Sequence, residues 1–195
     1  AGSNFSRQII GGCEAVGECD IAAMNQALNA YLRRHDTFRS WFSDAGGGHF
    51  IRHAVENPDD IEFEPVDHGY LTVDEIHRLV IDIPSPLEWG CFTFGVVQNE
   101  GRFTFFAAMD HVHGDATLIG TTMLEANGMY SAISSGAEQV ALPDAGSFDD
   151  FCVRERESTA ALTVDSPGVR AWIEFAENNR DGFPEFPLPL GNPNE

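Results

Sequence analysis

The chain has 195 residues, 43% of them hydrophobic, which is long and apolar enough for a folded domain with its own core. Its formal net charge of −20 excludes nucleic acids and anionic membrane surfaces as expected partners, because both are recognised by clusters of Lys and Arg. No apolar run approaches the roughly 20 residues of a membrane-spanning helix. No signal peptide is visible and the four cysteines form no CxxC pair, so we expect a cytoplasmic protein with reduced thiols.

In chain order, the first strong element is a helix, IAAMNQALNAYLRRH, which follows Asp20 as its N-cap and repeats apolar residues every three or four positions. Three glycines at 46–48 interrupt the chain and predict a hairpin turn. Strands are expected at 50–55 and 61–68, and a short helix at 74–81.

Two apolar segments, 91–97 and 102–109, flank a polar QNEG turn and predict a second hairpin. Its second arm is apolar on both faces, which is typical of a central strand in a covered sheet. Further helices are expected at about 116–133, 148–161 and 168–178. This pattern predicts an α+β fold in which helices cover a mixed, mostly antiparallel sheet.

The polar stretch DHVHGD follows the apolar arm directly and has three interpretations. The first is a zinc site, since His111-x-His113-x-Asp115 is similar to the HxHxDH run of metallo-β-lactamase-type hydrolases, although Ala116 replaces the last His of that run. The second is a polar turn whose histidines are structural. The third is a catalytic His111 supported by Asp115, at a junction between a strand and a helix.

A second motif favours the third interpretation. Residues 34–42, RHDTFRSWF, resemble the RHExLRTxF signature of the condensation-domain superfamily, the chloramphenicol-acetyltransferase-like acyltransferases. Further along the chain, MDHVHGDA resembles the MHHxxxDG signature of the same superfamily. The order and spacing of the two motifs fit, and the resemblance covers roughly residues 15–135. The positions that match outright are Arg34, His35, Arg39, Phe42, Met109, His111 and Asp115.

The resemblance implies a role for three of these side chains. His111 corresponds to the active-site histidine, which acts as the general base. Asp115 corresponds to the motif aspartate, which supports the site by pairing with an arginine, and Arg39 is the matching arginine. Such a pair is physically reasonable because a carboxylate withdrawn from water needs a cation, and the guanidinium offers two parallel donors.

The second motif also departs from the superfamily pattern at two positions. Asp110 replaces the first histidine of the HH pair, and Ala116 replaces the motif glycine. His113 lies in the variable part of the motif. We treat Asp110, His113 and Ala116 as candidate substrate contacts, and we expect no metal at the site.

The implied activity is acyl transfer from a thioester, either acyl-CoA or an acylated phosphopantetheinyl carrier protein, to a hydroxyl or amine. No permanently bound cofactor is implied. Superfamily members serve nonribosomal peptide and polyketide biosynthesis. The DHVHGD variant and the Pro-rich tail are similar to polyketide-associated acyltransferases of actinobacteria, which esterify lipids or sugars. We therefore expect a small-molecule, lipid or sugar acceptor, and a place in lipid biosynthesis.

Superfamily members have two similar lobes, and their active-site histidine lies between them. We expect residues 1–180 to form the N-terminal lobe and residues 181–195 to be an extended, Pro-rich tail that leads to an absent second lobe. The chain alone is then an incomplete enzyme with little or no activity. Two alternatives remain: a non-catalytic binding or scaffold relative with a degenerate motif, and a metallohydrolase.

Overall fold

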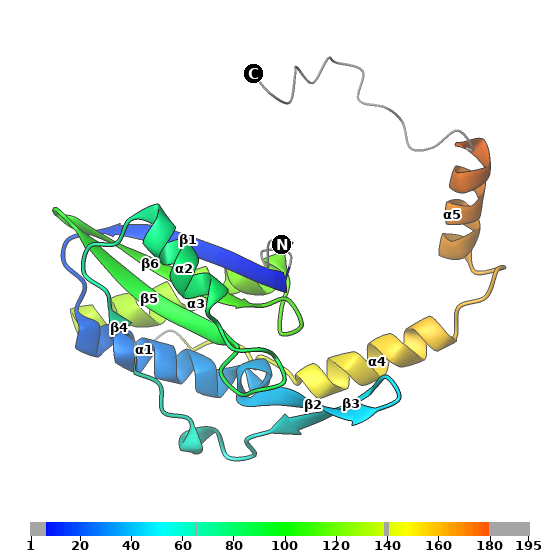
Figure 1. Ribbon diagram of the computed structural model, residues 1–195, viewed down its shortest axis with the longest axis horizontal. Helices are drawn as coiled ribbons and strands as arrows, with labels where there is room; N and C mark the ends of the chain where they lie inside the picture. The colour runs from blue at the N-terminus through cyan, green and yellow to red at the C-terminus, as the bar shows by residue number, and fades with distance from the viewer. Residues whose placement is uncertain (1–6, 65, 139–140, 180–195) are drawn as a thin grey trace. The chain divides into compact units, whose positions relative to one another are not determined.

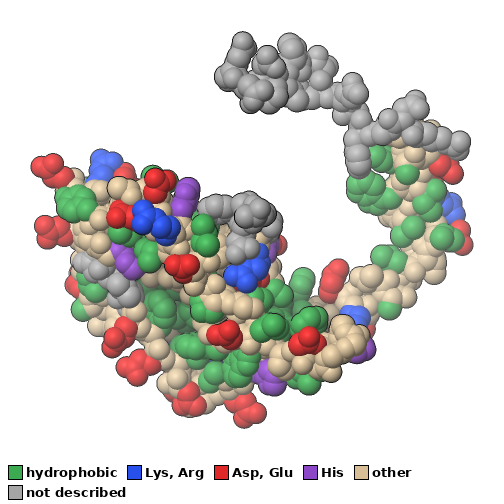
Figure 2. All heavy atoms as spheres, viewed as in Figure 1, with side chains coloured by type: hydrophobic (Ala, Val, Ile, Leu, Met, Phe, Trp, Pro, Cys, Tyr) green, Lys and Arg blue, Asp and Glu red, His purple; other side chains and the backbone are tan. Residues whose placement is uncertain are grey.

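The computed structural model describes residues 7–64, 66–138 and 141–179, which belong to two compact units. The first unit is Ala1–Phe148 and contains the sheet and both motifs; the second is Asp149–Glu195. On the face drawn in Figure 2, Asp and Glu side chains are scattered over the surface of the first unit, in keeping with the acidic composition.

The first unit is built on a four-stranded sheet in the order β1-β6-β5-β4 (Figure 1). The central strand β6 pairs antiparallel with both neighbours, whereas β4 pairs parallel with β5. This arrangement confirms the predicted hairpin and the central position of its second arm. The strands are β1 (Gln8–Val16), β4 (Val66–Asp67), β5 (Phe92–Asn99) and β6 (Arg102–Asp110).

Two long helices, α1 (Ile21–Arg34) and α3 (Ala116–Ser135), pack on one face of this sheet. Asp20 caps α1, since its Oδ1 accepts a hydrogen bond from the backbone N–H of Ala23 at 3.0 Å. The core between the helices and the sheet is rich in aromatic rings. Its fully buried members include Met24, Leu28, Tyr31, Phe38, Phe94, Phe103, Phe105 and Met109.

The opposite face of the sheet carries a smaller apolar cluster beneath α2 (Val73–Ile81). Val80 and Ile83 pack there against Cys91 and Ala108. In an antiparallel pair, side chains alternate between the two faces, so Ala108 and Asp110 point to this second face while Met109 points to the main core.

The glycines at 46–48 form the turn of a separate two-stranded sheet, as predicted. It joins β2 (Ser40–Gly46) to β3 (His49–Ala54), and all three glycines have positive φ, of 81°, 61° and 79°. Two short 3-10 helices, η2 (Asp36–Arg39) and η3 (Pro58–Asp60), flank this sheet in the sequence.

The strand predicted at 61–68 is wrong for its first half. Among the described residues of this range only β4 is formed, and Phe63 pairs with a side chain instead of a strand. The amide of Asn29, on α1, accepts a hydrogen bond from the N–H of Phe63 at 2.9 Å and donates one to its carbonyl at 2.7 Å. Asn29 thus takes the place of a neighbouring strand.

The second unit contains most of α4 (Phe148–Ala160) and all of α5 (Pro167–Asn178), which confirms both predicted helices. Neither helix contains a buried residue. The tail predicted at 181–195 lies outside the described residues. Among the helices that the structure describes, none is long and apolar enough to cross a membrane.

Candidate active site

His111 is the first residue after β6 and lies in a short turn that leads to α3. Its backbone N–H donates to the carbonyl of Arg7 at 2.8 Å, which extends the pairing of β1 with β6 by one residue. The residue itself is exposed. The sheet therefore holds the backbone of His111 while the residue stays exposed to solvent.

Asp110 is buried, with only 3% of its surface exposed, and it organises the turn. Its Oδ1 accepts a hydrogen bond from the N–H of Val112 at 3.0 Å, and its backbone carbonyl accepts one from the N–H of His113 at 3.0 Å. Its Oδ2 lies 3.1 Å from Nε of Arg7. This burial argues against the predicted contact between Asp110 and a substrate.

His113 is equally buried, and its contacts are internal. Its carbonyl accepts a hydrogen bond from Oγ1 of Thr37 at 2.8 Å, and its ring lies 5.9 Å from that of Phe42. Burial lowers the pKa of His113, and the nearby charge of Asp110 does not fully offset this effect. His113 is thus a neutral interior side chain, which again argues against a substrate contact.

The two sequence motifs meet at this point, because Thr37 and Phe42 both belong to RHDTFRSWF. The predicted ion pair between Arg39 and Asp115 is not what joins them. Oδ1 of Asp115 accepts hydrogen bonds from the N–H groups of Thr117 at 2.9 Å and Leu118 at 3.0 Å, so the side chain caps α3.

Arg39 instead donates from Nη1 to the carbonyl of Val55, 2.9 Å away, just after β3. The prediction of the pair is therefore corrected: each side chain has other partners. The physical reason is that the free N–H groups at the start of a helix stabilise a carboxylate without any cation.

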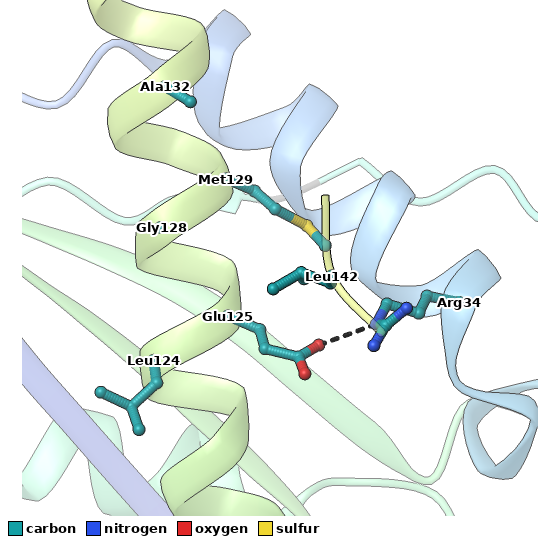
Figure 3. Close-up of a pocket in the computed structure, with 7 residues that line it drawn as sticks. All are labelled: Arg34, Leu124, Glu125, Gly128, Met129, Ala132 and Leu142. Carbon is teal, nitrogen blue, oxygen red and sulfur yellow. Dashed lines mark hydrogen bonds and ion pairs between the residues drawn. The ribbon is translucent and has the colours of Figure 1, made fainter. Parts of the chain in front are cut away.

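A second contact of the first motif, with the middle of α3, was not predicted. Glu125 of α3 accepts hydrogen bonds from Arg34 Nε at 3.1 Å and His35 Nε2 at 2.8 Å; the contact to Arg34 is drawn in Figure 3. Burial of Glu125 opposes its ionisation, but the bonds from His35 and Arg34 outweigh burial, so its pKa lies below the ordinary value. The sequence holds one signal for this role: Glu125 is the only charged residue in α3.

These contacts lie at a surface pocket between α1 and α3 (Figure 3). It is lined by Arg34, Leu124, Glu125, Gly128, Met129, Ala132 and Leu142. The remaining candidate, Ala116, is the exposed first residue of α3, and its contact with a substrate stays a prediction. Within residues 7–64, 66–138 and 141–179, no group of three or more His, Cys, Asp or Glu side chains is placed to hold a metal ion.

Several solved structures of low sequence identity share the fold of this chain. The condensation domain of the monacolin K polyketide synthase MokA superimposes with a TM-score of 0.68 at 18% identity, over 100% of this chain and 45% of that one. A likeness at such low identity shows the fold alone. The first condensation domain of the CDA synthetase is similar, with a TM-score of 0.65 at 20% identity, over 89% of this chain and 45% of that one. The chain has the fold of one lobe of these condensation domains, as the two motifs predict.

Within that class, the chain is homologous to the PapA acyltransferases. It is 51% identical to acyltransferase PapA3 of Mycobacterium tuberculosis over 194 residues, which are 100% of this chain and 41% of PapA3. It is 49% identical to the 2'-acyl-2-O-sulfo-trehalose (hydroxy)phthioceranyltransferase PapA1 of Mycobacterium bovis over 192 residues, 98% of this chain and 38% of PapA1.

The solved structure of the PapA2 acyl transferase superimposes with a TM-score of 0.75 at 45% identity, over 95% of this chain and 40% of that one. The chain thus spans about two fifths of the length of the relatives that it matches. No protein-family model matches it.

Proposed function

We propose that this chain carries the base of an acyltransferase that esterifies a sugar hydroxyl, and that His111 is this base. The observation that carries the proposal is the exposed imidazole of His111 on a backbone held by β1 and β6. The names of two relatives support the acceptor class, since PapA1 and PapA2 are described as acyltransferases of sulfated trehalose. The donor is an acyl thioester of coenzyme A or of a phosphopantetheinyl carrier protein.

In this reaction, a ring nitrogen of His111 takes the proton of the acceptor hydroxyl as its oxygen attacks the thioester carbonyl. The carbon–oxygen bond forms, the tetrahedral intermediate collapses, and the carbon–sulfur bond breaks. The departing thiolate then takes the proton back from the imidazolium, which regenerates the neutral base. A rigid backbone at His111 assists because orientation of the base is a large part of such catalysis.

The described residues leave His111 exposed, and an exposed base gives a thioester little protection from water. We therefore expect a second lobe to cover His111 during acyl transfer, and we expect the 195-residue chain alone to show little or no turnover.

The experiment uses the full-length protein that contains this chain, an acyl-CoA donor and 2-sulfotrehalose as acceptor. We expect His111→Ala to lower kcat by about 100- to 10,000-fold, the range for loss of a general base, with donor binding unchanged. Ester formation is measured by mass spectrometry and thiol release by a colorimetric assay. His49→Ala is the matched control, since His49 is an exposed histidine at the start of β3. Unchanged turnover in His111→Ala would falsify the proposal and favour a scaffold or binding role.

A further inference from the structure

The residue before the proposed base is an unusual one to bury. Asp110 occupies the position of the first motif histidine, and its side chain is only 4% exposed on the α2 face of the sheet. Its Oδ2 lies 3.1 Å from Nε of Arg7, whose side chain is 36% exposed. Neither of these two atoms has a hydrogen-bond partner, so their interaction is an ion pair. Nη2 of Arg7 also donates to the carbonyl of Ile83 at 3.3 Å, which anchors the guanidinium.

Both members of this ion pair also bind the backbone around His111. The carbonyl of Arg7 accepts from the N–H of His111 at 2.8 Å. Oδ1 of Asp110 accepts from the next N–H along the chain, that of Val112, at 3.0 Å. The backbone N–H groups of His111 and Val112 are thus hydrogen-bonded to Arg7 and Asp110, and these two residues form an ion pair with each other.

We propose that Arg7 and Asp110 form a positioning pair that holds the backbone of His111 in the orientation needed for acyl transfer. The inference rests on the proposed role of His111 as the base. Neither residue is assigned a contact with substrate, and each acts through His111. In this chain, the carboxylate at the position of the first motif histidine is buried and paired with Arg7, the residue before β1.

The pair should respond asymmetrically to substitution. Without Arg7, the carboxylate of Asp110 stays buried and unpaired, and it must take up a proton or turn toward water. Either change disturbs its bond to Val112. Without the charge of Asp110, Arg7, whose side chain is about one-third exposed, is solvated, and the turn is preserved because an asparagine at 110 can still accept from Val112.

The experiment compares Arg7→Met, Arg7→Met/Asp110→Asn and Asp110→Ala in the full-length protein. We expect Arg7→Met to lower kcat by roughly ten- to a hundredfold, the range for a misplaced catalytic group, with KM unchanged. The double variant should recover much of this loss, since it contains no unpaired charge. Asp110→Ala removes the side-chain oxygen that accepts from the N–H of Val112, so it should lower kcat with KM unchanged. If Arg7→Met does not fold, this variant tests the positioning role in its place.

Arg102→Met is the matched control. It breaks an ion pair with Glu14 on the same two strands, β1 and β6, but both of those side chains are about half exposed. A second readout is independent of activity: the ring-proton NMR signals of His111 should shift in Arg7→Met and not in Arg102→Met.

The proposal is overturned if Arg7→Met and Asp110→Ala match Arg102→Met in kcat and in the His111 signals. It is also overturned if the double variant is no better than Arg7→Met. Failure of the proposed function gives a different result, because His111→Ala would then keep its turnover while the NMR comparison still tests whether Arg7 holds His111.

Discussion

His111 and His113 are two positions apart in the sequence and lie in opposite environments. His111 is exposed on the turn, whereas His113 is buried against Thr37 and Phe42. A buried imidazole is stabilised in its neutral form because burial penalises the charged one. The two histidines therefore differ in surroundings: His111 is exposed, as the proposed base must be, and His113 packs the turn against the first motif.

The lowered pKa of His113 predicts a pH-dependent stability. In the unfolded chain a histidine titrates near 6.5, so below this pH the unfolded state binds a proton that the folded state does not. The free energy of unfolding should then fall as the pH drops from about 6.5 toward the lower folded-state pKa, by up to about 1.4 kcal/mol per pH unit. Urea unfolding at several pH values between 5 and 8 measures this slope.

His113→Phe should remove that part of the slope, because phenylalanine fills a similar space and binds no proton. His49→Gln is the control, since His49 is an exposed histidine at the start of β3. Parallel stability curves for the wild type and His113→Phe would show that the imidazole of His113 is not held neutral by the fold.

At the scale of single elements, α3 connects the site to the core. Its first turn is capped by Asp115, and its middle carries Glu125, which accepts hydrogen bonds from both Arg34 and His35 at the end of α1. Tyr31 of α1 also hydrogen-bonds Thr122 of α3 inside the core, at 2.7 Å. The middle of α3 is therefore tied to the C-terminal half of α1 and to the start of the first motif.

The capping role of Asp115 predicts an effect that distinguishes it from an ion pair. Asp115→Ala should lower the free energy of unfolding by about 1 kcal/mol, the usual cost of a lost N-cap. Asp115→Asn should cost clearly less, because asparagine caps helices nearly as well. Urea unfolding of both variants provides the comparison.

Arg39→Met completes this test. If Asp115 acts only as a cap, the effects of Arg39→Met and Asp115→Ala are independent and add in the double variant. If Asp115→Asn and Asp115→Ala lower the free energy of unfolding equally, and their effects are strongly coupled to that of Arg39→Met, the result would instead support an ion pair between Arg39 and Asp115.

At the scale of the whole molecule, the core belongs entirely to the first unit. Every buried hydrophobic side chain that the structure describes lies between Cys19 and Ala126. The second unit has large exposed apolar side chains instead, among them Phe151, Trp172 and Ile173. Exposed apolar groups of this size favour association with other surfaces.

We therefore expect a chain shortened after residue 148 to fold on its own. Its thermal unfolding should remain cooperative, with a midpoint within about 4 °C of that of the full chain, which corresponds to a change of at most about 1–2 kcal/mol. Circular dichroism measures the midpoint, and light scattering should show less self-association in the shortened chain. Loss of a cooperative transition would mean that residues 149–195 stabilise the first unit.

Local sequence signals determined most of the elements. The N-cap and periodicity of α1, the glycine turn between β2 and β3, and the apolar arms of β5 and β6 each lie within a short stretch of chain, so they could be interpreted without the fold. The strand β1 was not predicted, because two glycines interrupt its apolar pattern and its pairing with β6 is distant in sequence. The two motifs identified the superfamily, which the comparisons with known proteins confirm.

Only the tertiary structure decided the partners of the charged residues. The sequence placed Arg39 and Asp115 in matching motifs, but in the fold the first N–H groups of α3 bind Asp115, and the carbonyl of Val55 accepts from Arg39. Likewise, nothing in the order of residues shows that Arg7 lies beside Asp110. A side chain pairs with whichever groups the fold brings within about 3 Å of it, and this depends on strand register and helix packing far from the motif.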